Sequence, residues 1–113
     1  IVDRKKDMIK TGGENVSGRE VEEVVYRHAA VAEVEVIGLP HAHWIEAVVA
    51  VVVPKAGATR DAEDILAHCR GALAGFKAPK AVVFAEDLPR NPSGKILKRE
   101  LREKFHGLFA QGD

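Results

Sequence analysis

The run Ala47-Val-Val-Ala-Val-Val-Val53 decides the fold, because it is apolar at every position, rich in β-branched residues and closed by Pro54. A strand with one face in water alternates apolar and polar residues, whereas a strand covered on both faces reads as a continuous apolar run. The run therefore predicts a central strand that is buried on both faces of a sheet.

The segment before this run predicts a partner strand. Val31–Leu39 alternates, with Val34 and Val36 on one side and glutamates on the other, which is typical of a half-buried strand. A Gly-Leu-Pro sequence ends it, and His41–Glu46 forms a short connection to the apolar run. We therefore expect the two strands to form an antiparallel pair.

One helix is expected before this strand pair in the sequence and two are expected after it. Ser17-Gly18-Arg19-Glu20 matches a capping box, in which the serine side chain accepts the amide of residue 20 and Glu20 reaches back. Asp61 can cap a second helix with Cys69 on its inner face, and Leu97–Phe105 predicts a short last helix.

Short strands complete the expected fold at the two ends of the chain. Residues 1–10 read as a strand or hairpin arm that enters the turn Thr11–Asn15, and Ala81–Phe84 reads as a third short strand. The sequence thus predicts an α+β domain, with a small mixed β-sheet, an N-terminal hairpin and about three flanking helices.

Composition argues against several classes of protein, among them nucleic-acid-binding and membrane-spanning proteins. The 113 residues fit one domain, and equal numbers of basic and acidic side chains, 17 each, give no global attraction to nucleic acid. No apolar run approaches the ~20 residues of a membrane helix. The single cysteine suits a reducing compartment, so we expect a cytoplasmic protein. His41 and His43 lack a cluster of acids or cysteines around them, so no metal site is expected.

The stretch Leu88–Ile96 is rich in residues capable of chemistry and poor in core residues. Two prolines stiffen it, and Gly94 frees the backbone next to Lys95. A lysine on such a loop is a point charge on a long arm, suited to phosphate or carboxylate oxygens and to charge that develops on a transferring group. An ordinary surface lysine is the alternative that these residues leave open.

The start of the chain offers a second such stretch. Arg4 is a candidate for bidentate contact with a phosphate or ribose, and Gly12 and Gly13 expose the backbone of the following turn to a ligand. A simple turn is the alternative. The chain opens at Ile1 inside this dense stretch and without a methionine, so we expect it to be part of a longer protein.

Two long motifs favour the functional interpretation of both stretches over an ordinary surface lysine and a simple turn. Asp3–Val16, which reads Asp-Arg-Lys-Lys-Asp-Met-Ile-Lys-Thr-Gly-Gly-Glu-Asn-Val, resembles the hinge motif of the adenylate-forming superfamily. Leu88–Leu101, with Pro-Arg-Asn-Pro-Ser-Gly-Lys-Ile, resembles the superfamily's C-terminal lysine motif. The resemblance runs from Val2 to Phe105, and its Gly-Gly-Glu-Asn form is similar to that of fatty- and aryl-acid CoA ligases.

The resemblance implies a role for each matched residue. Lys95 matches the adenylation lysine, which bridges carboxylate and phosphate oxygens while acyl-AMP forms. Arg4 matches the arginine that contacts the nucleotide, and Lys6 falls at the hinge about which the domain rotates between half-reactions. Gly13, with Gly12 beside it, matches the residue that lines the pantetheine tunnel.

Two further matches concern the nucleotide part of coenzyme A. Trp44 stands where related aryl-CoA ligases place a tryptophan against the adenine; packing on the end of the sheet is the alternative. Lys80 lies in a segment that can hold CoA phosphates, with Ala78 in place of an arginine found in some relatives, and a solvated surface lysine is the alternative.

The resemblance implies that the chain is one C-terminal domain, residues 1–113, of a carboxylic acid–CoA ligase whose large N-terminal adenylation domain is its partner. ATP, coenzyme A and a carboxylic acid are the implied ligands, with Mg²⁺ held mainly by the N-terminal domain. The isolated chain is expected to be inactive. A free-standing CoA- or partner-binding module is one alternative, and an adenylate-forming enzyme with another acceptor, such as a carrier protein or a luciferase-like reaction, is the other.

Overall fold

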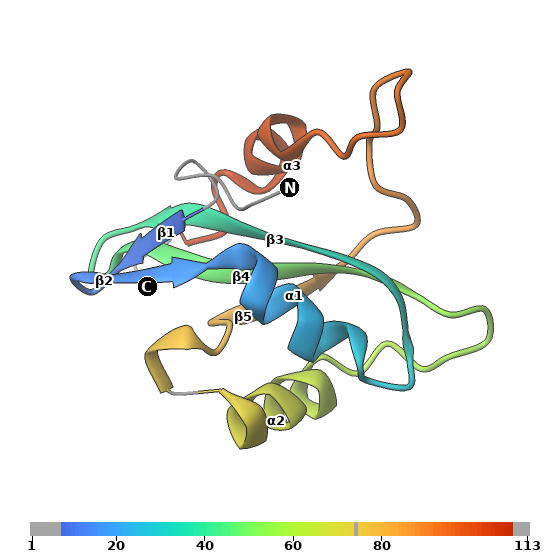
Figure 1. The fold of residues 1–113 in the computed structure, drawn as a ribbon, viewed down its shortest axis with the longest axis horizontal. Helices are drawn as coiled ribbons and strands as arrows, with labels where there is room; N and C mark the ends of the chain where they lie inside the picture. The colour runs from blue at the N-terminus through green and yellow to red at the C-terminus, as the bar shows by residue number, and fades with distance from the viewer. Residues whose placement is uncertain (1–7, 74, 110–113) are drawn as a thin grey trace.

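The computed structural model describes residues 8–73 and 75–109, which form one sheet with helices on both faces (Figure 1). The elements in chain order are β1 Met8–Thr11, β2 Glu14–Ser17, α1 Gly18–Tyr26, β3 Val31–His41, β4 Ile45–Pro54, α2 Ala62–Ala72, the 3₁₀ turn η2 Gly75–Lys77, β5 Ala81–Phe84 and α3 Lys98–Phe105.

The sheet is mixed, as the sequence predicts. Its strands follow the order β2-β1-β4-β3, all antiparallel, and β5 pairs with β4 in parallel over Val49–Val52. The β3–β4 pair is in register from Glu33 opposite Val53 to His41 opposite Ile45, which confirms the expected antiparallel pair. The β1–β2 hairpin joins it where Thr11 pairs with Ile45.

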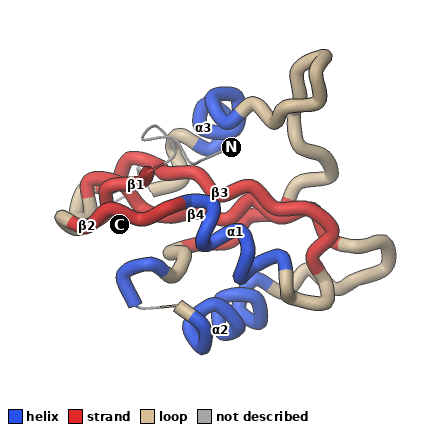
Figure 2. The backbone as a smooth tube through the Cα atoms, in the orientation of Figure 1, coloured by secondary structure: helices blue, strands red, loops and turns tan. Residues whose placement is uncertain are grey.

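Strand β4 is buried on both faces, which confirms the interpretation of its apolar run. Helices α1 and α2 cover one face of the sheet and α3 covers the other (Figures 1 and 2). Val48 and Val52 point into the core under α1 and α2, whereas Val49 and Val51 point into the core under α3. All four are fully buried.

The expectation that β3 is half-buried, with valines on one side and glutamates on the other, is wrong for Glu35–Leu39, where every residue is buried. Its Ile37 and Leu39 are buried under α3, and Glu35 is only 7% exposed. The Lys98 ammonium at the start of α3 lies 3.3 Å from the Glu35 carboxylate. The alternating pattern could not reveal this, because the helix that covers the face comes some 60 residues later in the sequence.

The two predicted N-caps are present. The Ser17 hydroxyl accepts the Glu20 N–H at 3.4 Å, and the Asp61 carboxylate accepts the Asp64 N–H at 3.1 Å. The Glu20 carboxylate also accepts a hydrogen bond from the ammonium of Lys77 at 3.1 Å.

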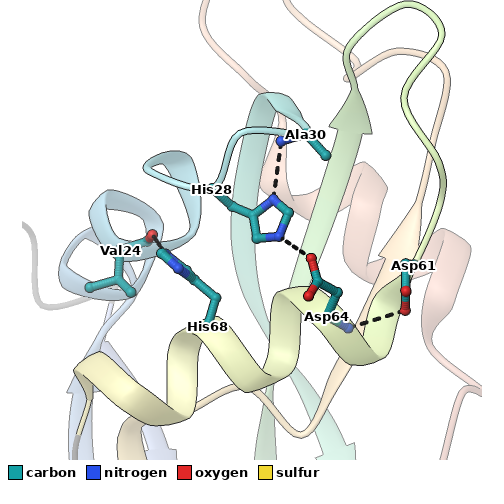
Figure 3. Close-up of polar contacts among 6 residues, drawn as sticks. All are labelled: Val24, His28, Ala30, Asp61, Asp64 and His68. Atoms are coloured by element: carbon teal, nitrogen blue, oxygen red, sulfur yellow. Dashed lines mark hydrogen bonds and ion pairs between the residues drawn. The ribbon is translucent and has the colours of Figure 1, made fainter.

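Two histidines join α1 to α2 (Figure 3). The Nδ1 atom of His28 accepts the Ala30 N–H at 3.1 Å, so its Nε2 carries the proton and donates to Asp64 at 2.7 Å. His68 Nε2 lies 2.8 Å from the carbonyl oxygen of Val24, and the two rings meet edge to face. These side chains are therefore structural, because their hydrogen bonds connect α1 and the turn after it to α2.

Ile45, at the start of β4, has a φ of +74° and is 68% exposed. A left-handed backbone costs a β-branched residue about 1–2 kcal/mol. Replacing Ile45 by glycine would remove this strain, but glycine loses more chain entropy on folding, which offsets about 0.5–1 kcal/mol of the gain. We expect Ile45→Gly to raise the free energy of unfolding by about 0.5–1 kcal/mol in urea denaturation followed by circular dichroism. Ile45→Val keeps the strain and should change little; a loss of stability in the glycine variant would contradict this account.

Candidate functional site

The predicted site residues within the described part of the chain gather at two places far apart on the domain. In Figure 1 the orange loop between β5 and α3, which carries Lys95, projects at the upper right. The blue turn between β1 and β2, which carries Gly12 and Gly13, lies at the far left. The described residues of the two motifs therefore lie at two separate places on one domain.

The Lys95 loop is a tight reversal with an exposed lysine. Gly94 has a φ of +88°, a conformation that glycine adopts without strain, and it turns the chain directly before Lys95. The Asn91 side chain accepts backbone N–H groups of Ser93 and Lys95, each at 3.0 Å. The backbone of Lys95 is thus held in place while its side chain extends into solvent.

The base of the loop is attached to the fold. The Leu97 N–H donates to the Pro89 carbonyl at 2.8 Å, and Arg90 forms an isolated β-bridge with Ile96. The Arg90 guanidinium also lies 3.0 Å from the Glu33 carboxylate on β3. A lysine on such a support can reach an anionic ligand presented from outside the domain, as the sequence predicts for Lys95.

The second site joins three predicted residues from different parts of the chain. The Gly12 N–H donates to the Trp44 carbonyl at 2.9 Å, and the Trp44 ring packs directly on Gly12. The Lys80 ammonium lies over the same ring, 4.6 Å from its centroid, and the His43 ring meets it edge to face. Gly13 is exposed beside them and has open space where a side chain would begin.

The environment of Trp44 and Lys80 differs from the surface picture that the sequence suggested. Trp44 is half-buried and packs at the end of the sheet, so the packing alternative is realised, while stacking on a base stays a prediction. Burial lowers the pKa of the Lys80 side chain from the ordinary lysine value. The backbone N–H of Lys80 donates to the Val48 carbonyl at 2.7 Å. The site therefore offers a cation on an aromatic face, suited to a phosphorylated ligand with a planar ring.

Two contacts in these sites escaped sequence reasoning. The Lys80–Trp44 contact joins residues 36 positions apart, and no local signal marks it. Asn91 does carry a local signal, since asparagine before a Pro-Ser-Gly sequence is a common turn former.

Other predicted residues are structural here or lie outside the described part. Arg4 and Lys6 fall in residues 1–7, which the structure does not describe. The Nδ1 atom of His41 accepts the N–H groups of His43 and Trp44, so it shapes the β3–β4 turn. Among the described residues no group of three or more histidines, cysteines or acids lies close enough to hold a metal ion.

Residues 20–95 match the family of AMP-binding enzyme C-terminal domains. The chain belongs to this family. It is 49% identical over 105 residues to a feruloyl-CoA synthase from Amycolatopsis and to the long-chain-fatty-acid–CoA ligase FadD13 of Mycobacterium tuberculosis, covering 93% of this chain and 21% of each relative. The crystal structure of ATP-bound MatB from Rhodopseudomonas palustris superposes with a TM-score of 0.91 at 45% identity, over 94% of this chain and 21% of that one.

Membership in the AMP-binding C-terminal family confirms the predicted α+β domain with its mixed sheet and three helices. The chain spans about a fifth of the length of the curated relatives it matches. Across residues 8–73 and 75–109, none of the helices has the length and apolar character needed to cross a membrane.

The contact between Gly12 and the only tryptophan can be tested by adding one methyl group. A Cβ at Gly12, which has a φ of +60°, would lie 2.9 Å from Cε3 of Trp44, whereas one at Gly13, with a φ of +86°, meets nothing within 4 Å. Both alanine variants carry backbone strain, and Gly12→Ala adds overpacking of about 1 kcal/mol.

We expect Gly12→Ala to be the less stable variant in urea denaturation and to shift the Trp44 fluorescence maximum, with Gly13→Ala leaving the emission unchanged. Equal emission shifts in the two variants would show that the indole does not rest on Gly12.

Proposed function

We propose that this chain is the C-terminal domain of an ATP-dependent carboxylic acid–CoA ligase and that it serves both half-reactions from its two ends. The observation that carries the proposal is the separation of two segments of the domain (Figure 1). The loop between β5 and α3, which carries Lys95, lies far from the β1–β2 turn, where Gly12 contacts Trp44 and the Lys80 ammonium lies over the Trp44 ring. The acyl pocket and most of the ATP site would lie in a larger N-terminal domain. The isolated chain would then have no activity.

Lys95 would act in the first half-reaction. A carboxylate oxygen of the acid attacks the α-phosphorus of ATP and forms an O–P bond, which gives acyl-AMP. The bond from the α-phosphorus to the bridging oxygen breaks, and pyrophosphate leaves. Negative charge shifts among the carboxylate and phosphate oxygens during this step. The backbone of Lys95 is held by a hydrogen bond to Asn91, while its side chain extends into solvent. The ammonium can therefore lie between these oxygens and stabilise that charge when the domain brings it into position.

The opposite end would act in the second half-reaction. The CoA thiol attacks the acyl carbon, loses its proton and expels AMP. Gly12 and Gly13 would let the pantetheine arm pass close to the backbone, and Lys80 would hold a CoA phosphate beside Trp44. Rotation of the domain about Lys6 would bring first the Lys95 end and then the Trp44 end to the N-terminal domain. Such a hinge rotation requires changes of φ and ψ in only a few residues.

The ligands follow from the two steps: ATP, coenzyme A and a carboxylic acid, with the N-terminal domain as the partner. The names of the relatives support CoA as the acceptor, since a feruloyl-CoA synthase and a fatty-acid–CoA ligase are among them. Mg²⁺ would neutralise ATP phosphates and be held mainly by the N-terminal domain. The identity of the acid would be set in that domain as well.

Two other functions are separable by experiment. A CoA- or partner-binding module without catalysis would bind CoA but contribute nothing to adenylation. An enzyme that passes its acyl group to a carrier protein or another acceptor would keep the role of Lys95 and lose the dependence on Trp44 and Lys80. The Lys80–Trp44 contact, which holds a cation next to an aromatic face, favours free CoA.

Lys95 is expected to matter for one half-reaction alone. In the full-length enzyme Lys95→Ala should lower carboxylate-dependent pyrophosphate release by about 10²–10³-fold, the usual loss for a group that stabilises developing charge. Thioester formation from supplied acyl-AMP should stay within about twofold of the wild type.

Lys55→Ala is the control, because Lys55 is an exposed lysine in the turn between β4 and α2. Equal loss of both half-reactions in Lys95→Ala would refute the assignment.

Lys80 provides a test with pH. Burial lowers its pKa, so it loses its charge at a lower pH than an ordinary lysine. We expect the affinity of the full-length enzyme for desulfo-CoA, which has no titrating thiol, to fall as pH rises through that lowered pKa. Lys80→Arg stays charged over the same range and should keep the affinity constant. The same alkaline loss in both proteins would place the titrating group elsewhere.

A further inference from the structure

We propose that Asn91 is a positioning residue for adenylation, which fixes the backbone from which the Lys95 ammonium is delivered. The inference rests on the proposed function of Lys95 and adds a second residue to it. Asn91 would touch neither ATP nor the acid, so its effect would pass entirely through the geometry of the loop.

Asn91 forms four hydrogen bonds within the loop. Its side-chain Oδ1 accepts the N–H of Ser93 and the N–H of Lys95, both at 3.0 Å. Its own N–H donates to the Lys95 carbonyl at 2.9 Å, and its carbonyl accepts the Gly94 N–H at 2.8 Å. The peptide groups on both sides of Lys95 are therefore held by one residue.

The side-chain part of this arrangement needs a short acceptor at position 91. Pro92 has no N–H, so the first amides that can turn inward are those of the residues after it. The left-handed Gly94 reverses the chain and brings the Lys95 amide back toward Asn91. Asparagine and aspartate carry an acceptor oxygen at this reach, whereas alanine does not.

The base of the loop is fixed by contacts that do not involve the Asn91 side chain. Leu88 is buried in the core under α3, and Arg90 pairs with Glu33 and bridges Ile96. Loss of the Asn91 side chain should therefore loosen the tip of the loop and leave its base in place. Because the tip is exposed, water can replace the lost hydrogen bonds, and the stability of the domain should change little.

The chemical step is more sensitive than the fold to such loosening. A charged group must lie within a fraction of an ångström of its place in the transition state, and a misplacement of 1 Å can cost about 10²-fold in rate. A free loop would spread the Lys95 ammonium over many positions. The expected signature is a fall in kcat for adenylation without a matching rise in KM for ATP.

The test compares four variants of the full-length enzyme in both half-reactions. Asn91→Ala removes the acceptor, Asn91→Asp keeps an oxygen at the same reach, and Lys95→Ala removes the ammonium. Asp87→Ala is the control, because its carboxylate also accepts a backbone N–H, that of Leu88 at 2.8 Å, in the same loop but outside the turn. Hydrogen exchange of the Ser93 and Lys95 amides reports the loop geometry directly.

We expect Asn91→Ala to lower kcat for adenylation by about 10–10²-fold, to leave thioester formation from supplied acyl-AMP within about twofold, and to speed exchange of the two amides. Asn91→Asp should recover most of the rate and the protection, and Asp87→Ala should match the wild type in both. The urea midpoint of Asn91→Ala should stay close to that of the wild type.

Three results would overturn the proposal. The first two leave the proposed role of Lys95 intact, and only the third refutes that role as well. A normal adenylation rate in Asn91→Ala, with Lys95→Ala inactive, would leave the lysine assigned and remove Asn91 from its delivery. Equal impairment of Asn91→Asp and Asn91→Ala would show that the acceptor oxygen is not what matters. Full adenylation activity in Lys95→Ala would refute the proposed role of the lysine and this inference with it.

Discussion

The burial of β4 on both faces is the constraint on which the rest of the domain depends. Val48 and Val52 face the helices α1 and α2, and Val49 and Val51 face α3, so one strand joins two cores. Burying each valine side chain contributes about 1.5–3 kcal/mol. The same strand supplies hydrogen bonds to β3 along one edge and to β1 and β5 along the other. Each flanking element is therefore placed by its contacts with β4.

Both candidate sites take their positions from this strand. Trp44 comes immediately before β4, and Lys80 comes immediately before β5, with its N–H on the Val48 carbonyl. Because β5 runs parallel to β4, it carries the chain from the Trp44 end of the sheet to the other end, where the Ala85 N–H meets the Val52 carbonyl. The loop that bears Lys95 leaves from there. The parallel strand thus places the two candidate sites at opposite ends of the same sheet.

The charges around α3 fix the helix that follows Lys95. Lys98 lies 3.3 Å from the carboxylate of Glu35 and 3.9 Å from that of Glu22, which itself accepts the N–H of Val36 on the edge strand β3. One lysine thus links α3 to β3 and to α1. Since Lys98 stands three residues after Lys95, this network holds the helical end of the loop, and the Arg90–Glu33 pair holds the other end.

The sequence by itself determined the features that depend on neighbours within a few residues. The apolar run predicts β4, Ser17 and Asp61 mark the helix starts, and the two motifs indicate the family without any tertiary contact. Only the tertiary structure decided that Glu35 is buried under α3 and that Lys80 lies over Trp44. Local hydrogen bonds and periodicity leave a trace in adjacent residues, whereas burial and pairing across the sheet depend on elements that packing brings together from distant parts of the chain.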